Sequence, residues 1–264
     1  MTSVGLATAA FANMPQPLIY PAITEHKSTV IIAHGFGDSG NGYVPIVRNW
    51  QDSGLFQDTK FILPSAPAIS VTSAGGRPIP AWFDIRGERG PHVTFEDLTQ
   101  QNQDEEGMLQ SRDFFLSLIQ NEITEHAIPA SQIIMGGFSQ GSVMALLTGV
   151  TADVQLGGLF CLSGYLALAD AVRGGDGKTG GASKFPHARE GTGTEVLMIH
   201  GERDPVMNLD WAEKSRDIVK ELGYPVDSSI IPGLGHSINQ EVLAKVTAFI
   251  KRVQGKGRDR HDEL

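Results

Sequence analysis

Short apolar runs alternate along the chain with longer stretches of helical periodicity. The apolar runs predict buried strands over residues 29–33, 60–64, 132–136, 156–162, 195–200 and 226–231. Apolar positions at helical spacing predict helices over residues 104–126, 209–222 and 238–253, and another directly after residue 139. This alternation is typical of a mostly parallel sheet with helices on both faces, so we expect an α/β fold.

Several stretches depart from this alternation. Residues 69–80 combine apolar positions with glycines, prolines and small polar residues, and residues 174–193 have the Gly, Lys, Ser and Thr content of a long mobile surface loop. Residues 1–27 precede the first predicted strand as an N-terminal extension, and the charged residues 255–264 predict a disordered tail. There is no internal repeat. Because a single α/β domain of this length is common, we expect residues 1–264 to form a single domain.

Composition narrows the function classes. The 264 residues are 41% hydrophobic and 19% charged, which is ordinary for a globular enzyme with a real core. The formal net charge of −9 argues against a nucleic-acid partner, since phosphate contacts need a basic face. It also argues against simple electrostatic adhesion to anionic membranes. No stretch approaches the roughly 18 apolar residues of a membrane span.

The sequence gives conflicting indications of the cellular compartment. A single cysteine, Cys161, allows no intramolecular disulfide and lies in an apolar run, as expected for a small buried side chain in a reducing compartment. Residues 1–13 lack Lys and Arg and make a poor signal peptide. The last four residues, His261-Asp262-Glu263-Leu264, nevertheless match an ER-retention address. We expect a cytoplasmic protein, with the ER lumen as the alternative.

A candidate nucleophile lies between a predicted strand and a predicted helix. Gly137-Phe138-Ser139-Gln140-Gly141 fits the G-x-S-x-G nucleophile elbow. So short a motif also arises by chance, and its position between the two elements is what strengthens it. The two glycines remove side chains that would crowd a tight turn. Ser139 Oγ would then stand above the sheet near a helix N-terminus, as a nucleophile requires.

A serine nucleophile needs a base, and in this arrangement the chain order is Ser, then Asp or Glu, then His. His236 lies in a glycine loop just before the last predicted helix, and we favour it over the other histidines that follow the serine, His187, His200 and His261. The acid should follow the strand at 195–200, where Glu202 and Asp204 both qualify. We favour Asp204, which Pro205 rigidifies, as the group that orients the imidazole.

A tetrahedral oxyanion needs two backbone N–H donors. One is expected from Gln140, directly after the nucleophile. The other is expected from Phe36, which glycines flank on both sides in the loop after the first predicted strand. His34 and Asp38 either hold this loop in shape or contribute ordinary turn chemistry.

Five short segments along residues 29–253 together resemble a known protein family. They are His34-Gly35-Phe36-Gly37-Asp38-Ser39-Gly40, Trp82-Phe83-Asp84-Ile85, Gly136-Gly137-Phe138-Ser139-Gln140-Gly141, His200-Gly201 with Asp204-Pro205, and Gly235-His236. Together they resemble the acyl-protein thioesterase/lysophospholipase-carboxylesterase family of the α/β-hydrolase superfamily. The resemblance implies an α/β-hydrolase fold and a serine hydrolase that needs no metal or cofactor. It also implies thioesters or oxyesters of long acyl chains as substrates, typically S-palmitoylated proteins and lysophospholipids.

The resemblance also implies a lid-like loop over an acyl channel at residues 69–82. The channel residues would be Ile69, Val71, Ile79, Pro80 and Trp82, although Trp82 could equally be a core residue. Residues 73–77 are smaller and more polar than a long acyl channel would suggest, so the acyl length stays open. The segments at 87–96 and 174–193 look extended.

Three functions therefore compete. The first is an acyl-protein thioesterase that depalmitoylates proteins, and the second is a general carboxylesterase or lysophospholipase. The third is a catalytically inactive lipid-binding protein, which is disfavoured because Ser139, Asp204, His236 and the oxyanion loop are all present. The expected partners are acylated proteins or ester lipids, met in transient contact with a membrane surface by a monomer or weak homodimer. No cysteine/histidine ligand cluster suggests a zinc site, and no G-x-x-x-x-G-K-[ST] phosphate loop suggests a nucleotide site.

Overall fold

The computed structural model describes residues 11, 13–87, 94, 103–174, 185 and 193–259, with side chains of the last helix described as far as Lys256. Seven strands form one sheet in the order β1-β3-β2-β6-β7-β8-β9. Only β1 is antiparallel to its neighbour, so the predicted mostly parallel sheet is confirmed. The strands are β1 (Leu18–Tyr20), β2 (Ser28–Ala33), β3 (Thr59–Leu63), β6 (Ile133–Phe138), β7 (Gly158–Leu162), β8 (Glu195–Gly201) and β9 (Val226–Ile231).

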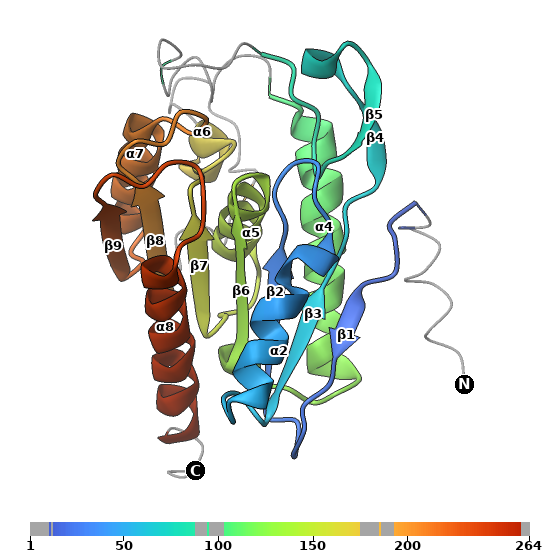
Figure 1. Ribbon diagram of the computed structural model, residues 1–264, viewed down its shortest axis with the longest axis vertical. Helices are drawn as coiled ribbons and strands as arrows, with labels where there is room; N and C mark the ends of the chain where they lie inside the picture. The colour runs from blue at the N-terminus through green and yellow to red at the C-terminus, as the bar shows by residue number, and fades with distance from the viewer. Residues whose placement is uncertain are drawn as a thin grey trace.

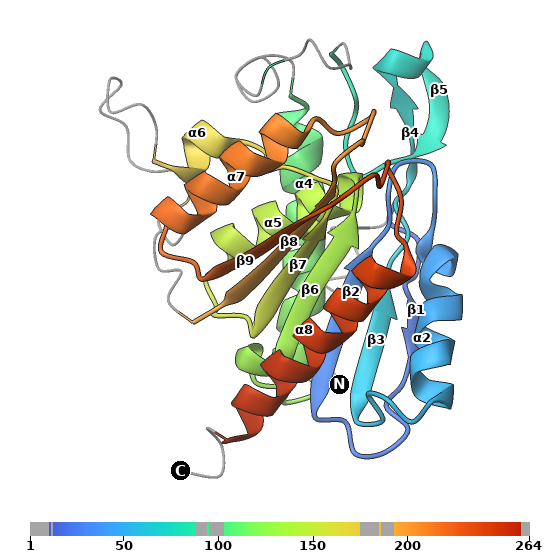
Figure 2. The same ribbon diagram turned by 60° about the vertical axis from the view of Figure 1, so that its left-hand side comes forward.

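Helices cover both faces of this sheet (Figures 1 and 2). One face carries α2 (Val44–Asp52) and α8 (Gln240–Asp259), and the other carries α4 (Glu105–Thr124), α5 (Gln140–Thr151), the short α6 (Ala169–Val172) and α7 (Leu209–Glu221). Alternate strand residues face the two cores, because side chains in a strand point to opposite faces. In β2, Ile31 joins the core under α4 and α5, whereas Val30 and Ile32 join the core under α2 and α8.

The central strand β6 and the helix α5 approach each other very closely. Every residue of α5 is buried, as expected for a helix that is largely apolar all round. A Cβ atom on Gly137 would lie 2.5 Å from the backbone carbon of Gly141, and one on Gly141 would lie 2.1 Å from the carbonyl oxygen of Ala33. The two glycines of the elbow motif are therefore required by the packing of strand end against helix start.

A second, two-stranded sheet stands beyond the carboxyl ends of the parallel strands (Figure 1). It is an antiparallel hairpin of β4 (Ala68–Val71) and β5 (Arg77–Pro80), in which Ile69 pairs with Ile79. The lid-like loop that the resemblance implied at residues 69–82 is therefore mostly a β-hairpin. The turn passes through a 3-10 turn, η2 (Thr72–Ala74), and two glycines with positive φ, Gly75 and Gly76.

Other boundaries also differ from those predicted. Strand β1 lies inside the expected N-terminal extension of residues 1–27, and α2 was not predicted. Helix α8 continues beyond Val253 to Asp259, into the expected disordered tail of residues 255–264. The expected mobile loop of residues 174–193 lies mostly outside the described residues, as do residues 88–93, residues 95–102 and both ends of the chain. Among the described helices, none is long and apolar enough to cross a membrane.

Candidate active site

Three side chains from separate loops meet beyond the carboxyl ends of the parallel strands. Ser139 follows β6, Asp204 follows β8, and His236 lies between β9 and α8. The Nε2 atom of His236 is 2.9 Å from Ser139 Oγ, and its Nδ1 atom is 2.7 Å from Asp204 Oδ2. An ionised carboxylate can only accept, so Nδ1–H donates to Asp204 and Nε2 is left to accept from the serine hydroxyl. The structure brings together the three side chains that the sequence pattern singled out.

The backbone of Ser139 takes a conformation that side-chain-bearing residues rarely adopt. Its φ is 55° and its ψ is −122°, and it leads directly into the first turn of α5. The backbone N–H of Ser139 donates to the carbonyl oxygen of Leu162 at 2.9 Å, which holds the turn against β7. Packing on both sides therefore maintains the turn that presents the hydroxyl to His236.

Asp204 uses each carboxylate oxygen differently. Oδ2 faces His236, while Oδ1 accepts the backbone N–H groups of Val206 and Met207, both at 2.9 Å. Burial alone would raise the pKa of Asp204, but the hydrogen bonds from His236, Met207 and Val206 outweigh it and lower the pKa below 3.8. The carboxylate is therefore ionised at neutral pH. The other candidate acid, Glu202, has a carboxylate that accepts from the backbone N–H of Gly233 at 2.8 Å instead.

His200, one of the other histidines that follow Ser139, lies behind the acid loop. Its ring is buried, and Nε2 donates to the carbonyl oxygen of Met207 at 2.8 Å. Burial lowers the pKa of His200 below 6.5, with smaller opposing contributions from Met207 and Asp204, so the ring is neutral at pH 7. Because Met207 in turn donates to Asp204, His200 supports the carboxylate from the side away from His236.

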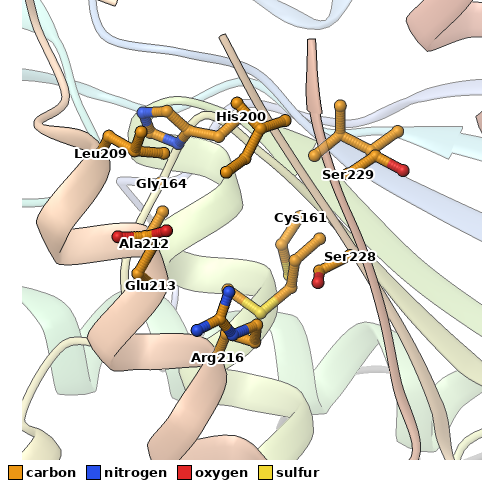
Figure 3. Close-up of a pocket in the computed structure, with 12 residues that line it drawn as sticks. Cys161, Gly164, His200, Leu209, Ala212, Glu213, Arg216, Ser228 and Ser229 are labelled. Carbon is orange, nitrogen blue, oxygen red and sulfur yellow. The ribbon is translucent and has the colours of Figure 1, made fainter. Parts of the chain in front are cut away.

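The His200 ring also lines a separate cavity of about 110 Å³ between α7 and strands β8 and β9. Figure 3 shows His200 at its upper end, Glu213 and Arg216 of α7 on one side and Ser228 on the other. Cys161 is also among the lining residues, and burial raises the pKa of this thiol to about 12. The lining does not include the triad residues, so this cavity is not the site of the hydrogen-bonded triad.

The loop expected to supply an oxyanion donor runs directly against the nucleophile. A Cβ atom on Gly35 would lie 3.3 Å from Ser139 Cβ. Phe36 follows Gly35, and the other expected donor, Gln140, is the first residue of α5. The structure thus places Gln140 next to the nucleophile in the chain and brings the segment that leads into Phe36 against it.

His34 gives this loop its shape. Its Nε2 atom accepts the backbone N–H of Ala66 at 2.9 Å, so Nδ1 carries the proton and donates to the carbonyl oxygen of Gly35 at 2.7 Å. Burial lowers the pKa of His34 below 6.5, against smaller contributions from Gly35 and Asp38, which keeps the ring neutral. Asp38 accepts from the backbone N–H of Ser39 at 2.7 Å, which is local turn chemistry.

The expected channel residues divide into two groups. Ile69 and Ile79 of the hairpin pack, half-buried, against fully buried Val71 in a small cluster that also includes Phe36, and Pro80 ends β5 half-exposed. Trp82 instead lies in the main core, with its ring centroid 4.7 Å from that of Phe115. Its contacts are those of a packed core residue.

No group of three or more His, Cys, Asp or Glu side chains within the described part of the chain is arranged to hold a metal ion. A serine hydroxyl, a histidine base and a buried carboxylate in one hydrogen-bonded chain form the arrangement that activates a nucleophilic oxygen for acyl transfer.

A parallel sheet with this triad at its carboxyl edge defines a serine hydrolase of the α/β-hydrolase class. The family model described as Phospholipase/Carboxylesterase matches residues 14–254. The chain therefore belongs to the phospholipase/carboxylesterase family, which confirms the predicted resemblance and fold class.

Relatives and solved structures agree with this assignment. Acyl-protein thioesterase 1 of Neurospora crassa is 37% identical over 255 residues, covering 97% of this chain and 98% of the relative. Acyl-protein thioesterase 1 of Gibberella zeae is 39% identical over 240 residues, covering 89% of this chain and 94% of the relative. A crystal structure of a variant of Arabidopsis thaliana SOBER1 has a TM-score of 0.73 and 27% identity, covering 86% of this chain and 99% of that chain.

Proposed function

We propose that the protein is an acyl-protein thioesterase, which hydrolyses the thioester between a fatty acyl chain and a protein cysteine. The observation that carries the proposal is the hydrogen-bonded chain from Ser139 through His236 to Asp204. The relatives named acyl-protein thioesterase 1 support the thioester as the substrate class.

In the proposed acylation step, Ser139 Oγ attacks the acyl carbonyl carbon while His236 Nε2 takes its proton. The carbonyl oxygen becomes an oxyanion, which accepts hydrogen bonds from the backbone N–H groups of Phe36 and Gln140. The tetrahedral intermediate then collapses, the carbon–sulfur bond breaks, and the thiol leaves with the proton held by His236. Asp204 stays ionised throughout and stabilises the imidazolium.

In the proposed deacylation step, a water molecule gives a proton to His236 Nε2 and attacks the ester formed on Ser139. Collapse of this second oxyanion returns the proton to Ser139 Oγ and releases the fatty acid. Each step uses only side chains and backbone amides of this chain, and the proposal includes no metal or cofactor.

The β4–β5 hairpin is the proposed acyl-binding element. Ile69, Ile79 and Pro80 are half-buried and would line the path of the acyl chain, with Val71 and Trp82 supporting them from the protein interior. We propose that acylated proteins or lysophospholipids reach the site in transient contact with a membrane surface, and that the protein works as a monomer or weak homodimer.

A specific observation favours a second candidate, a general carboxylesterase or lysophospholipase. The turn of the hairpin is built from small or polar residues, and it is exposed. Such a turn offers little apolar surface to a long acyl chain. An inactive lipid-binding protein is the third candidate.

Hydrolysis of a matched substrate series tests these three functions. Wild type and S139A are compared on acyl chains from acetyl to palmitoyl, each prepared as a thioester and as an oxyester. We expect Ser139-dependent turnover that rises with chain length and favours thioesters. Turnover confined to short oxyesters would support the carboxylesterase instead, and no Ser139-dependent turnover would favour the binding protein.

The compartment is proposed to be the cytoplasm, supported by a single, buried cysteine, with the ER lumen as the alternative. An internally tagged protein is compared with a version that lacks residues 262–264. Redistribution out of the ER on deletion would contradict the cytoplasmic proposal.

A further inference from the structure

A short segment that follows the hairpin holds the oxyanion loop on both sides of Phe36. This segment, residues 80–83, is called the strap below. The carbonyl oxygen of Pro80 accepts the backbone N–H of Gly37 at 2.9 Å. The indole Nε1–H of Trp82 donates to the carbonyl oxygen of His34 at 2.8 Å. The position of the Phe36 amide is therefore tied to the strap from both neighbouring sides.

The strap is in turn held by the side chain of Gln140. Its Oε1 atom accepts the backbone N–H of Trp82 at 2.8 Å, and its Nε2 atom donates to the carbonyl oxygen of Phe83 at 2.7 Å. One side-chain amide thus satisfies two strap residues, as a neighbouring strand would. Its orientation is fixed, because the N–H can only donate and the carbonyl can only accept.

Both partners of this contact are almost completely buried. Gln140 is 1% exposed and Trp82 is 2% exposed, so water cannot replace the hydrogen bonds if the amide is removed. Ser111 Oγ donates to the carbonyl oxygen of Trp82, which fixes the strap from the side of α4.

Gln140 therefore occupies two positions in one circuit. Its backbone N–H is one proposed oxyanion donor, and its side chain reaches through the strap to the loop that carries the other donor, Phe36. We propose that the Gln140 side chain is a positioning residue, which fixes the distance between the two amides that receive the oxyanion. This inference rests on the proposed function, since it assigns a role within that same site.

Spacing of these amides matters most when negative charge develops on the substrate oxygen. Donors aimed at the oxyanion stabilise the transition state more than the ground state, so a misplaced donor lowers the rate of acylation without weakening substrate binding in proportion. A tetrahedral adduct of an alkyl boronic acid on the nucleophilic serine places an oxygen in the same position. Its affinity therefore reports on the two amides independently of turnover.

The test compares wild type with Q140M, which keeps the side-chain volume but removes both hydrogen bonds. We expect the single-turnover acylation rate and the affinity for an alkyl boronic acid to fall together by about 10- to 100-fold, less than the roughly 100- to 1,000-fold typical of losing a donor outright. W82F, which keeps the aromatic ring and removes the indole donor, should change both quantities in the same direction. If Q140M does not fold, W82F provides the same test.

Q132M is the matched control. Gln132 is another buried glutamine, and it lies at the opposite end of β6 from Ser139, in the 3-10 turn η3 (Ala130–Gln132). Q132M should leave the acylation rate and the boronic acid affinity at wild-type values, whatever it does to the melting temperature.

The inference is overturned if Q140M and W82F retain wild-type boronic acid affinity, even when both are less stable than wild type. Failure of the proposed function looks different, because wild type itself would then show no Ser139-dependent turnover. Boronic acid binding to Ser139 would still report on the role of Gln140 in that case.

Discussion

The two carboxylate oxygens of Asp204 have different partners, and an amide could not take the place of this carboxylate. Oδ1 is occupied by the Val206 and Met207 amides, so only Oδ2 is available to His236. An asparagine at this position would keep its oxygen on those two amides and turn its NH₂ group toward His236. The imidazole would then have to present an acceptor at Nδ1, which leaves the proton on Nε2, where the serine proton should go.

D204N is therefore expected to lower kcat by roughly ten-thousandfold while the protein remains folded. Steady-state kinetics on the preferred ester measure the loss, and a thermal melt verifies folding. E202Q is the matched control, because the Glu202 carboxylate contacts Gly233 and not His236. A large loss in E202Q together with an active D204N would reverse the assignment of the acid.

The triad residues could be predicted from the sequence, because they belong to a motif and follow a fixed order along the chain. Ser139, Asp204 and His236 each followed or preceded a recognisable element, and the order in the chain selected among alternatives. The side-chain role of Gln140 could not be predicted, because its partner Trp82 is 58 positions away and contacts it through backbone atoms. The only signal was a long polar side chain at the start of a largely apolar helix.

At the scale of elements, Asp84 joins the hairpin to the rest of the site. Its carboxylate accepts from the backbone N–H of Thr72 at 2.7 Å and from the Thr72 hydroxyl at 2.5 Å. Burial alone would raise the pKa of Asp84, but the hydrogen bonds from Thr72 and Arg86 lower it below 3.8. Since Thr72 begins the turn between β4 and β5, Asp84 ties this turn to the segment that follows the hairpin.

D84N is expected to loosen the hairpin and so to weaken binding of long acyl chains more than short ones. A hydrogen bond to a charged group contributes ~1.5–3 kcal/mol, so a rise in KM of about tenfold is expected for the longest substrate. KM measured along the acyl series tests this expectation. S73A, an exposed neighbour in the same turn, should behave as wild type. A uniform loss across all chain lengths in D84N would contradict the proposed acyl-binding role of the hairpin.

Strands and helices with a long apolar face could be predicted from the sequence. Short elements, or elements with few buried residues, could not. Strand β1 has only the three residues Leu18–Tyr20, too few for a periodic signal. Strand β5 contains Pro78 and Pro80, which usually argue against a strand but are tolerated here because the hairpin has only two strands. Helix α2 begins at Val44, with a proline in its first turn and only Val47 and Trp50 buried.

At the scale of the whole molecule, acid should destabilise the fold in two stages. Burial lowers the pKa of His26, His34 and His200 below 6.5, so the unfolded chain binds more protons at these groups below that pH. Hydrogen bonds and ion pairs that outweigh burial lower the pKa of Asp84 and Asp204 below 3.8 and that of Glu195 below 4.5. Their contribution to stability is present above those values and is lost as pH falls through the folded-state pKa.

The free energy of unfolding is therefore expected to decline as pH falls below about 6.5, and to decline again below about 4.5. Urea unfolding across this range measures both stages. H26Q is a suitable variant, because His26 lies far from the catalytic residues along the sheet, facing Glu122, Lys60 and His126. It should reduce the first decline only. A stability that stays constant between about pH 7 and 5 would contradict the expectation.

The positive φ of Ser139 implies a conflict between durability and activity at one residue. At φ 55° and ψ −122° a side chain is strained by about 1–3 kcal/mol, whereas glycine is not. S139G should therefore melt at a higher temperature than S139A, although neither has a nucleophile. At Ser142, inside α5, the order should reverse, because a glycine weakens a regular helix. The strain at Ser139 therefore lowers stability at a residue that cannot be replaced without losing the nucleophile.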